Sequence, residues 1–62
     1  MNTAKKIKTH FNGDFNLLVQ LCEQSAVEID QDWFQEKTTY FFEDKSFLIW
    51  SGQSVATGKV IA

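Results

Sequence analysis

Few side chains in this 62-residue chain are of types that do chemistry, and their spacing favours binding over catalysis. The chain has one cysteine, Cys22, and one histidine, His10, whereas a structural zinc site needs four ligands of these types. His10 has no serine or cysteine at a spacing typical of nucleophilic catalysis. The three glycines are scattered, so no phosphate-binding loop is present. We therefore expect no enzymatic activity, no cofactor and no metal.

Carboxylates are the remaining reactive groups, and they occur as two close pairs, Glu43 with Asp44 and Asp30 with Asp32. Acid–base catalysis requires that burial or a neighbour raise the pKa of one member, and polar turns do not supply this. Asp30, Asp32 and Glu36 offer oxygen ligands but lack the glycine and the spacing of a calcium loop. These carboxylates are therefore candidates for electrostatic binding.

The charge is distributed unevenly along the chain. Residues 14–44 hold all eight acids and one lysine, Lys37, which gives this span a net charge of −7. Three lysines lie in the first eight residues, and the chain has no arginine, the usual choice for bidentate phosphate and guanine contacts. We expect no direct nucleic-acid binding. An acidic body of this kind attracts basic surfaces, such as the nucleic-acid groove of a partner; the alternative is that the acids only confer solubility.

The N-terminal part of the chain has the apolar spacing of two helices. Thr3 is placed to cap a short helix over residues 4–11, and Asp14 a second helix that ends near Ala26. The apolar arc of the second helix is broad because Leu17 and Leu21 widen it, which indicates packing on two sides. Cys22 lies in this arc, and we expect a small buried side chain.

After the second helix the pattern changes. Residues 27–30 alternate between apolar and acidic, which predicts a short strand or an extended exit from the helix. Residues 31–37 are predicted to form a loop or a turn of helix. This segment carries two adjacent large aromatics, Trp33 and Phe34. Either one of them packs beneath the loop, or the two form a recognition knob.

The strongest local pattern is a β-hairpin made of residues 38–42 and 47–50, which are rich in aromatic and β-branched side chains. A two-residue turn places Phe42 opposite Phe47. A three-residue loop with left-handed Lys45 places Phe41 opposite Phe47 instead, and the sequence leaves both registers open. Residues 54–61 are predicted to form a third strand, in which Gly58 marks a bulge or a close backbone approach.

These elements predict one α+β domain over residues 1–62, with one or two N-terminal helices packed on a three-stranded antiparallel β-meander. Both hairpin faces are apolar, yet the chain has enough helix for only one. Surplus aromatics should then form an exposed patch or a self-association surface. The alternative is that the first helix wraps round to cover the second face. The candidates for the exposed patch are Trp33, Tyr40, Phe41 and Trp50.

No apolar run is long enough to span a membrane, and no apolar stretch follows the N-terminal lysines. With a single cysteine, this predicts a cytoplasmic protein with a reduced thiol.

Residues 37–52, KTTYFFEDKSFLIWSG, carry the pattern Tyr-x-Phe-acid-Asp-x-Ser-x-Leu-Ile-x-Ser-Gly. This segment resembles the central hairpin of an acidic phage anti-CRISPR family that inhibits the type I-F surveillance complex. In that family the hairpin also follows a helix and an acidic connector. The resemblance implies a double-stranded-DNA mimic whose carboxylates occupy the lysine-rich channel of a CRISPR effector. Carried over onto this chain, the mimic carboxylates are Glu43 and Asp44, with Asp30 and Asp32 before them.

The sequence therefore predicts a phage or mobile-element inhibitor of a host defence nucleoprotein complex, most simply an anti-CRISPR that binds an effector and blocks nucleic-acid binding or cleavage. Acids supply the electrostatics, and two tryptophans supply apolar anchors of the kind that interfaces favour. The alternative is a small homodimeric structural or regulatory phage module that pairs through the second sheet face. The expected partner-binding residues are Asp30, Asp32, Trp33, Glu36, Glu43, Asp44 and Trp50.

Overall fold

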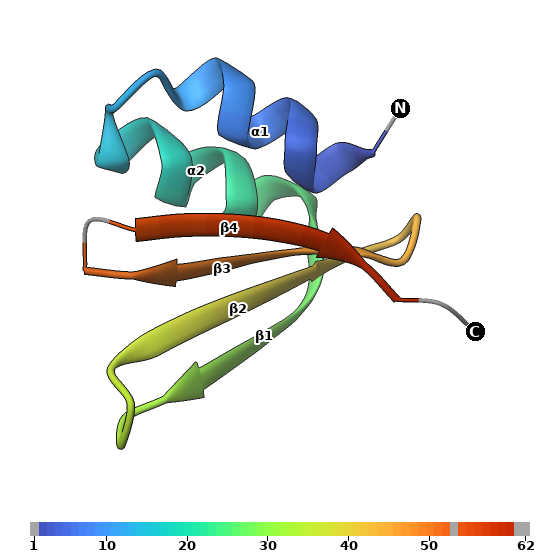
Figure 1. Cartoon of the computed structure of the whole chain (residues 1–62). Helices are drawn as coiled ribbons and strands as arrows, with labels where there is room; N and C mark the ends of the chain where they lie inside the picture. The colour runs from blue at the N-terminus through green and yellow to red at the C-terminus, as the bar shows by residue number, and fades with distance from the viewer. Residues whose placement is uncertain (1, 53, 61–62) are drawn as a thin grey trace.

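Two helices precede a four-stranded antiparallel sheet, and both helices lie on one face of it (Figure 1). The structure, a computed structural model, describes residues 2–52 and 54–60. The elements are α1 (Thr3–Phe11), α2 (Phe15–Ser25), β1 (Ala26–Asp32), β2 (Lys37–Phe42), β3 (Ser46–Ser51) and β4 (Ser54–Lys59). The strand order is β1-β2-β3-β4. The α+β class is confirmed, and the expectation of three strands is wrong by one.

The helices begin at side chains that accept backbone N–H groups. Asn2, rather than Thr3, caps α1, because its Oδ1 accepts from the Lys5 N–H at 2.9 Å. Asp14 caps α2 as predicted, accepting from two N–H groups of the first turn. The helix ends at Ser25, and Ala26 already has extended backbone. The chain therefore passes from α2 into β1 without a loop.

The additional strand, β1, explains the alternation at residues 27–30. It pairs with β2 from Asp32 opposite Lys37 back to Ala26 opposite Phe42, with an irregularity between Ala26 and Glu28. Residues 31–32, expected in a loop, belong to this strand, and residues 33–36 form a turn rather than helix. Of the two alternatives for residues 27–30, the short strand is the correct one. It is absent from the predicted three-stranded sheet because it lies at the sheet edge and is exposed along most of its length, so it lacks the apolar run of a buried strand.

The sequence left two registers open for the β2–β3 hairpin. The structure has the one with the three-residue loop. Lys45 has a φ of 70°, and its N–H donates to the Phe42 carbonyl oxygen at 3.1 Å. Phe41 consequently lies opposite Phe47, and Tyr40 opposite Leu48. This register turns Tyr40 and Trp50 toward the helices and Phe41 and Phe47 away from them.

The core lies between the helices and the sheet. α1 packs over β3 and β4, and α2 over β2. Trp50 joins the edge of this core, where its ring stacks on Phe15 with centroids 5.8 Å apart. Tyr40 and Trp50 are therefore not part of an exposed patch, and α1 does not wrap round to the second face. The buried apolar residues are Ala4, Ile7, Leu18, Cys22, Tyr40, Phe42 and Leu48.

The face of the sheet turned away from the helices, called the open face below, has an aromatic centre. The Phe41 and Phe47 rings lie 6.3 Å apart between centroids, and both are half-buried. The Phe47 ring lies across Gly58 of β4, where an added Cβ would come within 2.5 Å of Cζ. Of the two interpretations of Gly58, the close approach is therefore the correct one.

One carboxylate, that of Asp44 in the β2–β3 turn, connects the sheet to the start of α1. Its Oδ2 accepts from the Thr3 N–H at 2.8 Å and from the Thr3 hydroxyl at 2.9 Å. Its Oδ1 accepts from the backbone N–H and the hydroxyl of Ser46. The buried Ser46 Oγ in turn accepts from the Ala4 N–H at 3.2 Å. These donors, with the Ser46 hydroxyl the largest influence, hold the pKa of Asp44 far below its ordinary 3.8.

The low pKa of Asp44 predicts a specific acid sensitivity. Because the carboxylate is stabilised only in the folded state, its contribution is complete above the ordinary pKa of 3.8 and is lost as the pH falls below it. Asp44→Asn should lower the free energy of unfolding at pH 7 and should flatten its fall between pH 4 and pH 2. Urea unfolding at several pH values measures this. Asp30→Asn, at an exposed position, is the matched control, and equal pH profiles for the two variants would contradict the assignment.

The contact between Phe47 and Gly58 predicts that substitutions at these two positions have coupled effects on stability. Gly58→Ala should lower the free energy of unfolding by about 0.5–1.5 kcal/mol, the cost of a side chain held off its preferred rotamer, because the Phe47 ring must move. In a Phe47→Leu background the same change should cost distinctly less, and a double-mutant cycle measures the difference. Additive effects of the two substitutions would argue against this contact.

Candidate functional site

The turn between β1 and β2 presents the two most exposed large apolar side chains of the described chain. Trp33 is 83% exposed and Phe34 is 100% exposed; the pair is called the aromatic tip below. The turn is nevertheless built in a defined way, because Asp32 Oδ1 accepts from the N–H groups of Phe34 at 3.0 Å and Gln35 at 3.1 Å. Neither aromatic packs beneath the turn, so of the two alternatives the structure has the projecting knob.

Beside the tip lies a shallow hollow of about 320 Å³. Three of the predicted partner-binding residues line it together: Asp32, Trp33 and Glu36. Glu36 has a φ of 53°, which closes the turn before β2. An apolar anchor and two carboxylates thus share one end of the sheet. The complete lining is Gln31, Asp32, Trp33, Glu36, Lys37 and Thr38.

An acidic stripe, made of Glu28, Asp30 and Asp32, runs along β1 toward the tip. These residues pair with Phe41, Thr39 and Lys37 of β2, so all three lie on the open face. Asp30 and Asp32 are among the predicted partner-binding residues, whereas Glu28, in the same acidic connector, is not. The apolar–acidic alternation of residues 27–30 was the signal that could have identified it, because alternate residues of a strand share a face.

Glu43 and Asp44 lie at the opposite end of β2 from the tip (Figure 1). The structure therefore does not bring them together with Asp30 and Asp32. Asp44 has both oxygens engaged by Thr3 and Ser46, so its role in the fold is that of a structural acceptor. Glu43 is exposed in the same turn.

Trp50, the second predicted anchor, lies on the helix side of β3. Besides stacking on Phe15, it donates from Nε1 to the Gly52 carbonyl oxygen at 2.7 Å. It is half-buried and faces away from the acidic stripe. Of the two tryptophans, only Trp33 therefore projects beside the stripe.

The thiol of Cys22 and the phenol of Tyr40 are both buried in the core. Burial, reinforced by Glu23, raises the pKa of the Cys22 thiol to about 11, so the thiolate is scarce at neutral pH. Burial also raises the pKa of Tyr40. Among residues 2–52 and 54–60, no three His, Cys, Asp or Glu side chains are grouped so that they could hold a metal ion.

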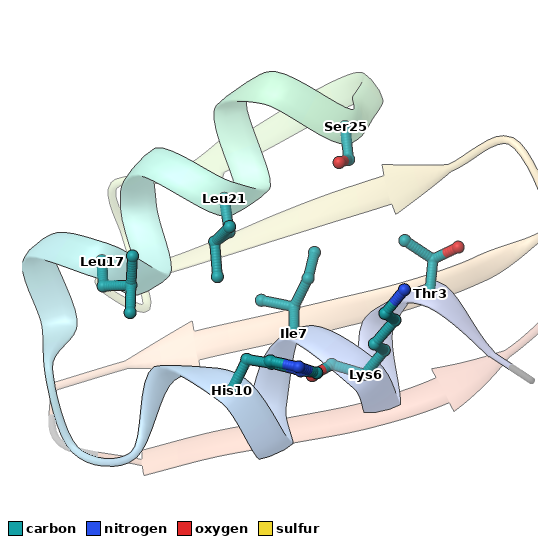
Figure 2. A pocket seen from close by; sticks show the side chains of 7 residues that line it. All are labelled: Thr3, Lys6, Ile7, His10, Leu17, Leu21 and Ser25. Carbon is teal, nitrogen blue, oxygen red and sulfur yellow. The ribbon is translucent and has the colours of Figure 1, made fainter.

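A second concave feature, called the helix groove below, lies between α1 and α2 on the other side of the molecule (Figure 2). Its volume is about 470 Å³. Ile7, Leu17 and Leu21 provide its apolar surface, and Lys6 and His10 line it from α1. The sequence contained its signal in the broad apolar arc of α2, although no ligand role was assigned to it. Thr3 and Ser25 complete the lining.

No helix within the described residues is long and apolar enough to cross a membrane. Comparisons of the chain with models of protein families, with curated proteins and with solved structures find no match. The chemistry of its own surfaces is therefore the basis for assigning a function.

Proposed function

We propose that this protein is an inhibitor, of phage or mobile-element origin, that binds a host defence nucleoprotein complex and keeps nucleic acid from it. An anti-CRISPR acting on an effector is the form that the hairpin resemblance favours. The observation that carries the proposal is the juxtaposition of the acidic stripe with the aromatic tip. An interface built from these parts has an electrostatic component and an apolar anchor.

The spacing of the acidic stripe supports mimicry of a nucleic-acid backbone. Its carboxylates belong to alternate residues of one antiparallel strand, which are roughly 6.8 Å apart at about 3.4 Å per residue. Phosphates along one strand of duplex DNA rise by about 3.4 Å each. The stripe therefore repeats at about the axial rise of every second phosphate. Lysines that contact a DNA backbone recognise charge rather than base identity.

The distribution of charge over the whole molecule also favours binding through the open face. Lys5, Lys6 and Lys8 all lie on α1, on the helix side of the sheet, whereas the stripe lies on the open face. The small net charge of −2 thus conceals an uneven distribution, although Lys37 lies opposite Asp32 on the open face. Such a charge distribution turns the acidic face toward a basic surface as the two approach.

The aromatic tip would supply the affinity that exposed carboxylates alone do not. Surface ion pairs contribute little net energy because water and salt screen them. A tryptophan that becomes desolvated at an interface contributes far more. Because Asp32 already holds the turn in place, little additional ordering is needed on binding.

A second candidate function is the homodimeric module. The observation that favours it is the uncovered apolar centre of the open face, formed by Phe41, Phe47 and Ile49. Pairing of two open faces would cover these side chains. It would also bring acidic stripes near one another when the β1 strands meet, which opposes that arrangement.

The first test identifies the partner. The tagged chain is expressed in bacteria that carry several CRISPR systems, and the proteins that co-purify at moderate salt are identified by mass spectrometry. We expect one effector complex in near-stoichiometric amount. Recovery of the folded chain by itself from every system would contradict the proposal.

A second test, on the identified complex, separates the effect of the charge of the acidic stripe from the effect of the net charge of the chain. Asp30→Lys should slow association about tenfold or more and flatten its dependence on salt, because the stripe loses its central carboxylate. Glu23→Lys, on the helix side, changes the net charge equally and should have a much smaller effect. Trp33→Ala should instead speed dissociation. Association kinetics over a range of salt concentrations measure all three, and equal effects of the two lysine variants would reject the stripe.

A further inference from the structure

The aromatic tip and the helix groove have complementary chemistry, although they lie on different parts of the molecule. The tip projects two large apolar side chains into solvent from an ordered turn, with Asp32 and Glu36 on either side of them. Exposed apolar features of this kind mark interaction sites. An aromatic side chain that becomes buried removes roughly 150–250 Å² of surface from water, so a fitting cavity would bind it strongly.

The helix groove combines an apolar surface with basic groups. Its volume of about 470 Å³ falls in the range of roughly 300–1,000 Å³ that is typical of binding pockets. Ile7, Leu17 and Leu21 line it, and the Lys6 and His10 side chains lie along its α1 side (Figure 2).

The basic side of the groove is prepared for carboxylates. His10 Nδ1 lies 2.8 Å from the Lys6 carbonyl oxygen. Because a carbonyl only accepts, Nδ1 carries the proton; Nε2 of the neutral ring is then an acceptor and donates to a carboxylate only in the imidazolium form. The Lys6 ammonium, one helical turn before His10 on the same face, supplies a positive charge beside it. An occupant with an apolar end and flanking acids fits these groups.

We propose that the aromatic tip of one copy docks in the helix groove of a second copy, with Glu36 and Asp32 directed toward Lys6 and His10. The acids of the tip meet the basic helix α1, so the contact is complementary in charge as well as in polarity. It is a head-to-tail contact, in which each copy uses two different surfaces. A chain of such contacts keeps one free tip at one end and one free groove at the other, so association continues beyond the dimer unless the chain closes into a ring.

This self-association goes beyond the proposed function and limits it. Trp33 cannot contact a partner complex while it lies in the groove of another copy. Copies whose tips are docked in this way would therefore be inactive as inhibitors. Dilution or a competing partner would release the active monomer. The contact itself involves this chain alone, so it can be tested whether or not a host complex is found.

Sedimentation velocity of the purified protein over a wide concentration range tests the proposal. We expect the mean mass to rise with concentration and to pass beyond that of a dimer. The tip variant, Trp33→Ser with Phe34→Ser, and the groove variant, Lys6→Glu with Leu17→Glu, should each weaken association at least about tenfold. Lys8→Glu, on the same helix but outside the groove lining, is the matched control and should retain association.

Mixing the two variants gives the decisive result. The groove variant still has its tip, and the tip variant still has its groove, so an equimolar mixture should form a heterodimer that does not grow further. Its formation also shows that both variants are folded. A wild-type chain that stays monomeric at the highest concentration would overturn the proposal. So would a dimer that persists in both variants, or folded variants, by circular dichroism, that fail to combine.

Discussion

The fold depends on the carboxylate of Asp44, which joins positions 41 residues apart in the chain. It accepts both donors of Thr3 at the start of α1 and both donors of Ser46 at the start of β3. Ser46 continues the connection to the next helical N–H, that of Ala4. A charged acceptor with several donors is a strong and directional contact. It fixes one end of α1 beside the β2–β3 turn, and from there the helix runs over β3 and β4. The choice of which sheet face is covered follows from this anchor together with the core that forms beneath it.

Because the two helices cover only one face of the sheet, the other face stays exposed and is available for binding. A chain of this length has limited capacity to bury surface. Its two helices pack on β2, β3 and β4. The edge strand β1 consequently lies in solvent and carries carboxylates on alternate residues. The unequal coverage also separates the charges, with lysines on α1 and acids on β1. The same constraint thus produces the acidic stripe, the open aromatic face and the polarity of the molecule.

Sequence reasoning succeeded where local chemistry decides the structure and was incomplete where tertiary context does. The Asp14 cap, the two helices and the β2–β3 hairpin follow from local spacing and were predicted. The strand β1 was underestimated because an exposed edge strand needs no apolar face. The role of Asp44 required knowledge that the first helix returns to the turn, which no local pattern contains. Trp50 looked like a surplus aromatic until the hairpin register turned it toward Phe15. That Asp30, Asp32 and Glu36 lie near one another could be expected from their closeness in the chain. The helix groove could not be expected in this way, because it depends on how α1 and α2 pack against each other.

The two ends of the described chain meet at the β2–β3 turn, where Thr3 contacts Asp44 and the Val60 N–H donates to the Lys45 carbonyl oxygen at 2.7 Å. Ends that lie this close can be joined by a short linker without reorganising the sheet, so the topology is suited to circular permutation. The aromatic tip lies at the far end of the sheet from this junction (Figure 1). A label or fusion joined to the described chain at Asn2 or Val60 would therefore begin at the opposite end of the sheet from the tip. A chain reopened at the Asn12–Gly13 connection would keep every strand of the meander in sequence.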